Sequence, residues 1–586
     1  MKHLQTLLTL LPLLFTFSVA VAGITNTPSD FPSPTPAPTP ETPLKLPAII
    51  ADHMVLQQKL ADPIWGWDTP GTRVTVSFAG KEYTATAGSD GRWVVKLDPM
   101  PANATPQTMT ITGSSKRELA DILIGEVWMC SGQSNMEFRL AEDSNGPVEA
   151  ASANIPGIRL ITVPHVGTQE LQKDFKGEWT PCNPGSAAKF SAVGFFFGRY
   201  LHQILNVPVG LINDSWGGSS AEAWVRRSSL EQDPRFKPLI ERTVKRESGI
   251  NSGLAKSEYE KQMAAWQVAS DKDKAEGKPL PRQPSDPSVF LTDQHRPGNI
   301  FAGMVYPTLG YGIKGVIWYQ GESNAGQAYE YNVLFPFLIE QWRKEQGQGD
   351  FPFYWVQLAN YQATKPQPSE SNWAELREAQ TKTMQLTNTG QAVIIDLGNG
   401  INIHPRNKHD VAARLVRWAL VKDYGVQTPG SFMPFRSPEF QSVAFAGNKA
   451  TVTIDSFGSQ LRPFGTEEVT GFALCGPDQV WHWAKGKVLG KNQVEVISDE
   501  VPAPLAVRYA WADNPVCNLY SVDGLPLTPF RTDDFPISTA PKPSPQPGTA
   551  AQVAPLSPTA QASPGSVHSA SLKTTNQPST PAVIHP

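Results

Sequence analysis

The stretch "ILIGEVWMCSGQSNME" (Ile122–Glu137) contains an apolar run that stops abruptly at small polar residues. The first eight residues have the length and composition of a buried β-strand. The run then meets Ser-Gly-Gln-Ser-Asn, where Gly132 permits a tight turn that exposes a side chain. A serine in a turn usually caps the backbone, so the stretch alone predicts only a turn. Any chemical role of Ser134 depends on the rest of the chain.

The region around this stretch alternates between apolar runs of strand length and amphipathic helical stretches. This alternation predicts an α/β domain over residues 120–424, with a parallel sheet covered by helices on both faces. A charged, helical segment at about 226–297 is interpreted as an insertion into that domain. The predicted strands after the first are 207–214, 315–320, 351–359 and 391–398, and the predicted helices are 191–205, 328–346, 373–386 and 408–424.

The regions on either side of this domain have a different pattern. Residues 47–119 and 425–535 show short alternating runs separated by Gly, Pro, Asp and Asn turns, which predicts a β-sandwich-like module in each. Residues 23–46 form a Pro/Thr/Ser-rich linker, and residues 536–586 lack the apolar mass to fold and are predicted to be disordered.

The first 22 residues have the layout of a secretory signal peptide. Lys2 and His3 precede an apolar stretch, and Ala-Val-Ala at 20–22 supplies small residues for cleavage. A retained membrane anchor is the alternative, but Thr6, Thr9 and Pro12 interrupt the run. We therefore expect export to the periplasm, the cell surface or the medium, and no membrane partner beyond this segment.

Charge and cysteine content restrict the partners further. The formal net charge of −4 gives no reason to expect nucleic acid as a partner. The four cysteines include no CxxC pair, so no thiolate metal site is predicted. One or two disulfides are possible in an exported chain, and Cys475 with Cys517 is the more natural pair. The oligomeric state cannot be read from the sequence.

Four predicted strands are followed by loops rich in Gly and hydrogen-bonding residues. They are "CSGQSNME", "NDSWGGSSAEAW", "QGESNAG" and "GNGINIHPRNK". In a doubly wound sheet the carboxyl ends of the strands share one edge, where ligands bind. The sequence therefore predicts an active site at this edge.

Acyl transfer needs a nucleophile, a base and donors for an oxyanion. Ser134 is the candidate nucleophile, although the G-x-S-x-G elbow of α/β-hydrolases is absent because Met136 follows two residues later. His404 lies in a Gly/Asn loop rather than on an apolar helix face, which favours a general base over a core histidine. Oxyanion donors are expected among the residues of the other two loops, for each of which turn formation is the alternative role. They are Gly217, Gly218, Gln320 and Asn324.

The four loops together resemble the sequence blocks of the sialate O-acetylesterase family, a branch of the SGNH hydrolases. The N-terminal "DHMVLQ" and "PIWGWDTPGTRVTVSF" and the C-terminal "AVRYAWADNPVCNLY" and "GLPLTPFRTDDF" extend the resemblance from about Leu46 to Phe535. The resemblance implies a three-layer α/β fold with a flavodoxin-like parallel sheet. It also implies hydrolysis of acetyl esters on sugars without a metal or another cofactor.

Carried over by position, Ser134 matches the family's nucleophile and lends its own N–H to the oxyanion. Gly217 or Gly218 matches a second donor, the Gln320 side chain is the expected third donor, and His404 matches the base.

The same resemblance assigns Glu322 and Asn324 to bracing the "GQSN" loop.

Many SGNH hydrolases place an acid three residues before the histidine, but this chain has Ile401 there. Asp396, at the end of the preceding strand, is the nearest upstream acid and the candidate third member of a triad, with strand-end capping as its alternative role. The other possibilities are a Ser-His dyad oriented by a backbone carbonyl, or an acid from elsewhere.

The resemblance implies O-acetylated sialic acid as substrate, while acetylated xylan or pectin would need the same machinery. A sialic acid site needs a cation for the carboxylate, and Arg139, Arg377 and Arg406 lie near the loops. A hypothesis from a different functional class is a non-catalytic carbohydrate-binding protein with a hydrolase-like core. Its 16 tryptophans would stack on sugars. A phospholipase-like enzyme is a weaker third option.

Overall fold

The computed structural model describes residues 44–427 and 433–542. The predicted signal peptide, nearly all of the predicted linker, and the predicted tail from residue 543 onward lie outside the described residues. The described residues up to Ala540 form one unit. Within the described ranges, no helix is long and apolar enough to cross a membrane.

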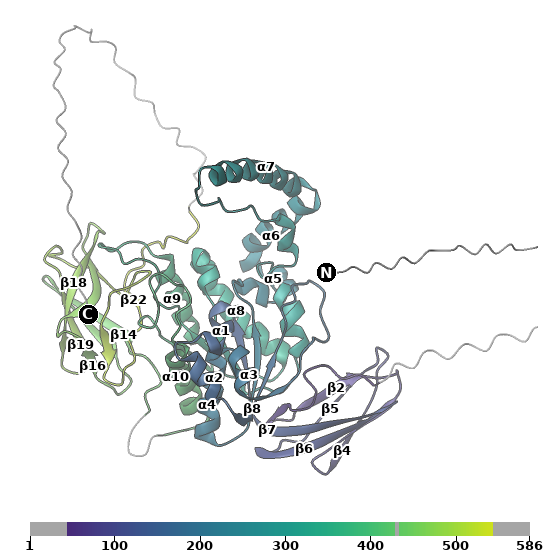
Figure 1. Ribbon diagram of the computed structural model, residues 1–586. Helices are drawn as coiled ribbons and strands as arrows, with labels where there is room; N and C mark the ends of the chain where they lie inside the picture. The colour runs from purple at the N-terminus through teal and green to yellow at the C-terminus, as the bar shows by residue number, and fades with distance from the viewer. Residues whose placement is uncertain (1–43, 428–432, 543–586) are drawn as a thin grey trace, which may run out of the picture. The chain divides into compact units, whose positions relative to one another are not determined.

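A parallel sheet forms the centre of the molecule, as the alternating pattern predicts (Figure 1). Its strand order is β13-β12-β11-β7-β10-β8, with the short antiparallel strand β9 at the edge. One parallel strand, β8, is absent from the sequence prediction. The strands are β7 (Lys116–Gly132), β8 (Ile155–Thr162), β9 (Thr180–Cys182), β10 (Val209–Ser215), β11 (Gly315–Tyr319), β12 (Phe353–Val356) and β13 (Thr389–Ala392).

Helices cover both faces of this sheet. Successive side chains of a strand point to opposite faces, so Val316 and Trp318 of β11 pack in one hydrophobic cluster with α8 (Ala328–Gln346) and α9 (Asn372–Lys382). Ile317 and Tyr319 pack in a second cluster with α4 (Ala192–Leu205) and α10 (Lys408–Trp418). The short helices are α1 (Ser134–Glu137), α2 (Gly146–Ser152) and α3 (Pro184–Lys189).

Strand β7 belongs to the central sheet and to the N-terminal β module at once. Its first part pairs antiparallel with β6, and its last residues pair parallel with β10 and β11. The boundary predicted between residues 119 and 120 therefore lies inside a continuous strand, near Asp121, whose φ is 55°. The other strands of this module are β1 (Val55–Gln57), β2 (Pro63–Trp67), β3 (Arg73–Phe78), β4 (Lys81–Thr86), β5 (Arg92–Lys96) and β6 (Asn103–Thr112).

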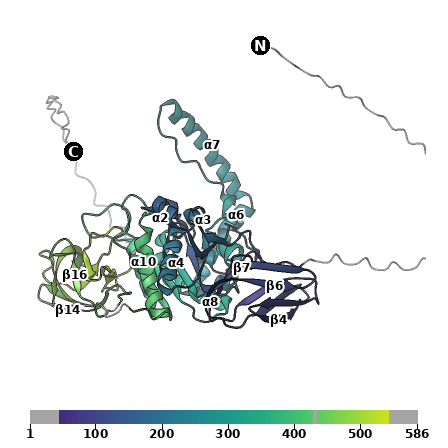
Figure 2. The same ribbon diagram turned by 60° about the horizontal axis from the view of Figure 1, so that its bottom comes forward.

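The predicted insertion is helical and extends away from the sheet (Figures 1 and 2). It contains α5 (Arg227–Gln232), α6 (Lys237–Asn251) and the long helix α7 (Leu254–Ala275).

The C-terminal module is an antiparallel seven-stranded sheet of order β14-β15-β19-β18-β17-β20-β22. Its hydrophobic cluster includes Val393 and Ile395, which directly follow β13 of the central sheet. All four cysteines are free thiols, so the possible disulfide between Cys475 and Cys517 is not formed. The strands are β14 (Glu439–Ala446), β15 (Lys449–Asp455), β17 (Val469–Cys475), β18 (Trp481–Leu489), β19 (Gln493–Ile497), β20 (Ala506–Tyr509) and β22 (Phe530–Arg531), and a separate pair is β16 (Leu461–Pro463) with β21 (Leu519–Ser521).

Candidate active site

Ser134 and His404 meet at the carboxyl edge of the central sheet. The Ser134 Oγ lies 2.8 Å from the His404 Nε2, although the two residues are separated by 270 positions in the chain. Both side chains are partly exposed. Burial and the nearby charge of Lys408 lower the pKa of His404, which favours the neutral imidazole that accepts a proton from a hydroxyl.

The turn that presents Ser134 depends on Gly132. Its φ of +132° is a conformation that side-chain-bearing residues rarely adopt, and an added Cβ would lie 2.3 Å from the Tyr319 carbonyl oxygen. The Gln133 N–H donates to that same carbonyl at 2.9 Å. Ser134 is thereby fixed as the first residue of α1, directly beyond the end of β7.

Two backbone N–H groups, one in each of the loops that follow β7 and β10, are available as oxyanion donors. Within the described part of the chain, neither Ser134 N–H nor Gly218 N–H donates a hydrogen bond. Gly217 packs against Ser134, since an added Cβ would lie 3.4 Å from the Ser134 Cβ. Its N–H, however, donates to the Glu137 Oε2 at 2.7 Å. Of the two predicted glycines, the structure leaves Gly218 able to donate.

Gln320 does not have the predicted role of a third donor. Its amide nitrogen donates to the Ser219 carbonyl at 3.1 Å and to the Asn324 Oδ1 at 2.7 Å. Its Oε1 accepts from the Tyr331 hydroxyl at 3.0 Å, and the side chain is fully buried. Because both amide hydrogens are engaged in this network, Gln320 braces the loops instead of facing a substrate.

Glu322 contacts the "GQSN" loop that carries Ser134, whereas Asn324 contacts a different loop. The Glu322 Oε1 accepts from the Asn135 Nδ2 at 2.6 Å. Asn324 accepts from the Ala221 N–H and donates to the Glu222 Oε2, each at 2.9 Å. The expectation that Asn324 holds the "GQSN" loop is therefore wrong, because its amide is engaged by the loop that follows β10.

Asp396 does not contact His404. The Arg414 guanidinium, on α10, donates to both Asp396 carboxylate oxygens at 2.6 and 2.7 Å. This bidentate pair draws the carboxylate toward the helix, so the structure gives no support to Asp396 as a triad member. Within residues 44–427 and 433–542, no carboxylate makes a hydrogen bond or ion pair with the His404 ring.

Backbone and amide contacts hold the histidine loop instead. The Asn402 Oδ1 accepts from the His404 N–H at 2.9 Å. The Asn135 Nδ2 donates to the Ile403 carbonyl at 3.0 Å, which ties this loop directly to the nucleophile loop.

A buried lysine, Lys408, links the same loops, and the sequence does not predict this role. The Lys408 Nζ donates to the Asn135 Oδ1 at 2.6 Å and lies 4.8 Å from the centre of the Phe138 ring. Burial lowers the pKa of Lys408 to about 7. Lys408 stands within "IHPRNK", but a lysine at a helix start ordinarily predicts a solvated charge, so the sequence carries no signal for this role.

A second histidine supports the other side of the nucleophile loop. The His165 Nε2 lies 3.2 Å from the Glu137 Oε1, and the ring stacks on Trp216 with 4.7 Å between ring centres. The contact with Glu137 raises the pKa of His165. Glu137 in turn accepts from Gly217, so this pair fixes the glycine loop against Ser134.

The three candidate cations differ in what they contact. Arg377 is fully buried and donates to four backbone carbonyls, those of Leu358, Ala359, Ala512 and Asp513. Arg406 donates to the carbonyls of Glu142 and Asp143. Arg139 is exposed, and its side chain makes no hydrogen bond or ion pair within the described ranges. Among these three, Arg139 alone has a guanidinium without a hydrogen bond in the described ranges, and its charge acts on Glu137.

Comparison with known proteins also indicates a carbohydrate esterase. A family model described as "Carbohydrate esterase, sialic acid-specific acetylesterase" matches residues 303–413, which contain the "QGESN" and "IHPRNK" loops. The sialate O-acetylesterases of Mus musculus and Homo sapiens are 29% and 28% identical to this chain over 527 residues, covering 82% of this chain and 93% and 91% of theirs. A crystal structure of a carbohydrate acetylesterase from Xanthomonas citri superposes with a TM-score of 0.70 at 36% identity, covering 84% of this chain and 100% of that one.

The mixed α/β fold, the serine-histidine contact and these similarities define a carboxylic ester hydrolase of the carbohydrate esterase class. Within that class, the chain belongs to the carbohydrate acetylesterases, and it is similar in sequence to the sialate O-acetylesterases.

Proposed function

We propose that this enzyme removes acetyl groups from O-acetylated carbohydrates, with Ser134 as nucleophile and His404 as general base. The observation that carries the proposal is the 2.8 Å contact between Ser134 Oγ and His404 Nε2 at the sheet edge. That distance is within the range needed for proton transfer between a nucleophile and its base.

In the proposed reaction, the Ser134 Oγ attacks the acetyl carbonyl carbon while the His404 Nε2 takes the hydroxyl proton. The N–H groups of Ser134 and Gly218 stabilise the tetrahedral oxyanion. Breakage of the bond to the sugar oxygen follows, and His404 gives its proton to that oxygen. Water then attacks the acetyl-serine, releasing acetate and restoring both side chains.

We propose a serine-histidine dyad rather than a triad. The support is the bidentate pairing of Asp396 with Arg414, together with the contacts that orient the histidine loop through Asn402 and Asn135. These contacts restrict the position of the imidazole, which is the function that a third acid serves in other hydrolases.

The SGNH arrangement is part of the proposal. It is supported by Ser134 after β7, Gly218 after β10 and His404 after β13, all at the carboxyl edge of one parallel sheet. We further propose that the modules 47–119, 120–424 and 425–535 act as one enzyme. Export of the chain rests on residues 1–22 alone, which lie outside the described residues.

O-acetylated sialic acid is the proposed substrate class, on the strength of the relatives named sialate O-acetylesterase. Of the three predicted cations, Arg139, five residues after Ser134, is the one whose guanidinium makes no hydrogen bond within the described ranges. Acetylated xylan and acetylated pectin are the alternatives to be compared directly.

The decisive experiment measures hydrolysis of 4-nitrophenyl acetate by the parent enzyme and by Ser134→Ala. Loss of the nucleophile is expected to reduce kcat by at least about a thousandfold. Equal rates would end the assignment of Ser134, and absence of turnover by the parent would favour a binding protein with a hydrolase-like core. O-acetylated sialic acid, acetylated xylan oligomers and acetylated oligogalacturonides, compared by kcat/KM, then identify the sugar.

A further inference from the structure

A cavity adjoins the loops that carry the proposed catalytic groups. This cavity of about 410 Å³ lies between the loops after β10 and β11 on one side and helix α6 of the insertion on the other. Ser323 lines it and also donates its hydroxyl to the Gly218 carbonyl at 2.8 Å. Ser323 therefore connects the cavity wall to Gly218, whose N–H is a proposed oxyanion donor. The cavity volume is within the range of about 300–1,000 Å³ that is usual for small-molecule sites.

The cavity wall presents one unpaired cation. Arg246 of α6 is exposed, makes no ion pair within the described ranges, and has its guanidinium 3.8 Å from the centre of the Phe290 ring. Its neighbour Arg242, in contrast, forms a bidentate pair with Glu330, with distances of 2.8 and 2.7 Å. The charge of Arg246 is thus available to an anion entering the cavity.

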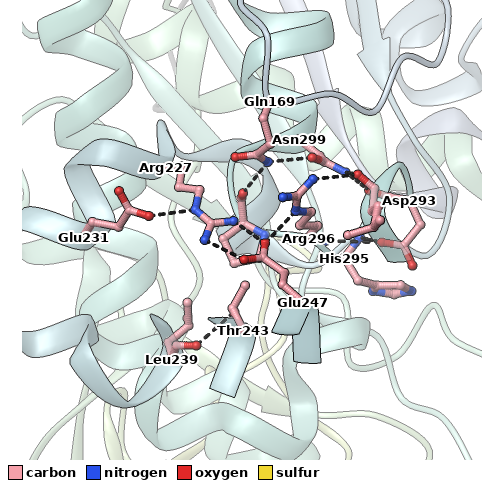
Figure 3. A network of polar contacts seen from close by, with 12 residues as sticks. Gln169, Arg227, Glu231, Leu239, Thr243, Glu247, Asp293, His295, Arg296 and Asn299 are labelled. Atoms are coloured by element: carbon pink, nitrogen blue, oxygen red, sulfur yellow. Dashed lines mark hydrogen bonds and ion pairs between the residues drawn. The ribbon is translucent and has the colours of Figure 1, made fainter. Parts of the chain in front are cut away.

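The opposite side of the cavity supplies neutral hydrogen-bonding groups. The His295 Nδ1 lies 2.9 Å from the Ser220 Oγ, which leaves the other ring nitrogen for a ligand. The backbone N–H of His295 donates to the Asp293 Oδ1 at 2.8 Å, so the loop that bears the ring is fixed (Figure 3). Gln327 and Asn324 also line the cavity, together with two carboxylates that already have partners. Glu222 accepts from the Asn324 Nδ2 at 2.9 Å, and Glu330 is paired with Arg242.

Helix α6 is held in place by an ion-pair cluster next to Arg246. Figure 3 shows Glu247 between the guanidinium groups of Arg227 and Arg296, with contacts of 3.0 Å to the Arg227 Nη2 and 2.7 Å to the Arg296 Nε. Their side chains are only 13–18% exposed, so water screens the pairs little. The cluster positions the helix turn that carries Arg246 before any ligand arrives.

We propose that this cavity is a substrate subsite for a carboxylate-bearing saccharide unit, with Arg246 binding the carboxylate and His295 and Ser323 contacting hydroxyl groups. The inference rests on the proposed esterase function, and it assigns the helical insertion a part in choosing acidic glycans. Both sialosides and galacturonides carry this chemistry, and the arms of the experiment separate them.

The test compares Arg246→Gln with the parent on four substrates. They are an O-acetylated sialoside, an acetylated oligogalacturonide, a neutral acetylated xylo-oligosaccharide and 4-nitrophenyl acetate. We expect kcat/KM to fall about tenfold on a carboxylate-bearing substrate, mainly through KM, because a charge-assisted contact is lost. The neutral oligosaccharide and the small ester should be hydrolysed at unchanged rates.

Lys245→Gln is the matched control, since it removes one positive charge from the same exposed helix turn without lining the cavity. An equal fall for both variants, or an equal fall on the neutral oligosaccharide, would overturn the subsite. The subsite would also be overturned if the parent enzyme cleaved neutral acetylated sugars but neither of the two acidic substrates. Since Ser134-dependent hydrolysis of the small ester is measured in the same series, failure of the subsite is distinguishable from failure of the esterase function.

Glu247→Gln tests the positioning role separately. Weakening the pairs with Arg227 and Arg296 should raise KM for the acidic substrate while kcat on the small ester stays unchanged. A fall in kcat on both substrates would show a general loss of structure and would contradict a role confined to the subsite.

Discussion

The imidazole of His404 is the group whose protonation should control the rate. Burial, followed by the charge of Lys408, holds its pKa below the ordinary value of 6.5. Only the neutral ring accepts the Ser134 proton, so activity is lost as the pH falls through this lowered pKa. We expect kcat/KM for 4-nitrophenyl acetate to rise with pH through one ionisation whose midpoint is below 6.5. A midpoint above that value would contradict the assigned environment.

Lys408 gives a second prediction about the same ionisation. Lys408→Met removes the positive charge that disfavours the imidazolium, so the midpoint of the pH profile should move upward. The substitution also leaves the buried Asn135 Oδ1 without its donor, which should lower the free energy of unfolding by about 1–3 kcal/mol. Urea unfolding measures the latter.

The control for that experiment is Lys422→Met, which removes an exposed charge close to the end of the same helix. If both variants shift the midpoint equally, the effect arises from net charge and not from the position of Lys408.

Asp396→Asn separates a dyad from a triad. Because both oxygens of Asp396 bind Arg414, we expect kcat/KM within about threefold of the parent, whereas loss of an orienting triad acid costs about ten-thousandfold. The free energy of unfolding should fall by about 1–2 kcal/mol as a charge-assisted pair is weakened. A thousandfold loss of activity in a stably folded variant would restore Asp396 to the catalytic machinery.

The individual partners of site residues were the hardest feature to predict. Loop position along the chain correctly places Ser134 and His404 at one edge, because parallel strands end together. Which hydrogen-bond partner a side chain has depends on groups distant in sequence. Gln320 accepts a hydrogen bond from Tyr331 of α8, and Asp396 accepts one from Arg414 of α10. The hydrophobic periodicity of the sequence does not specify how these helices are rotated relative to the loops.

At the level of elements, the turn between β7 and α1 depends on a single glycine. In Gly132→Ala the new Cβ would collide with the Tyr319 carbonyl and the φ of +132° would be strained. We expect at least a tenfold fall in kcat, and a free energy of unfolding lower by about 1–3 kcal/mol. Stopped-flow or steady-state hydrolysis and urea unfolding measure the two effects.

Gly71→Ala is the matched control, because Gly71 has a φ of +84° in open space within the N-terminal module. It should cost about 1 kcal/mol of stability and leave kcat unchanged. Equal losses of activity in the two variants would remove the special role assigned to the nucleophile turn.

Element types were predicted well because their periodic patterns are long. Helices α4, α8, α9 and α10 all begin within one residue of their predicted starts. Strand β8 was missed, since Pro156 and Gly157 at its start are typical of a turn. A tertiary effect, pairing with the buried strand β10, overrides that local signal.

For the whole molecule, the C-terminal module is expected to be required for folding of the catalytic region. Truncation after Gln427 would remove two carbonyl acceptors of the buried Arg377 and expose Val393 and Ile395. We expect such a chain to be insoluble or to lack esterase activity, because an uncompensated buried charge is strongly destabilising. Soluble expression with the parent kcat on 4-nitrophenyl acetate would contradict this.

The passage of β7 through two modules has an evolutionary consequence. A module joined by a loop can be exchanged between genes as a cassette, since recombination cuts only a connection. Here a crossover between residues 119 and 120 would sever a strand that pairs with β6 on one side and with β10 and β11 on the other. We therefore expect the N-terminal module and the serine turn to be inherited together, so that homologues that retain the turn also retain the β module that precedes it.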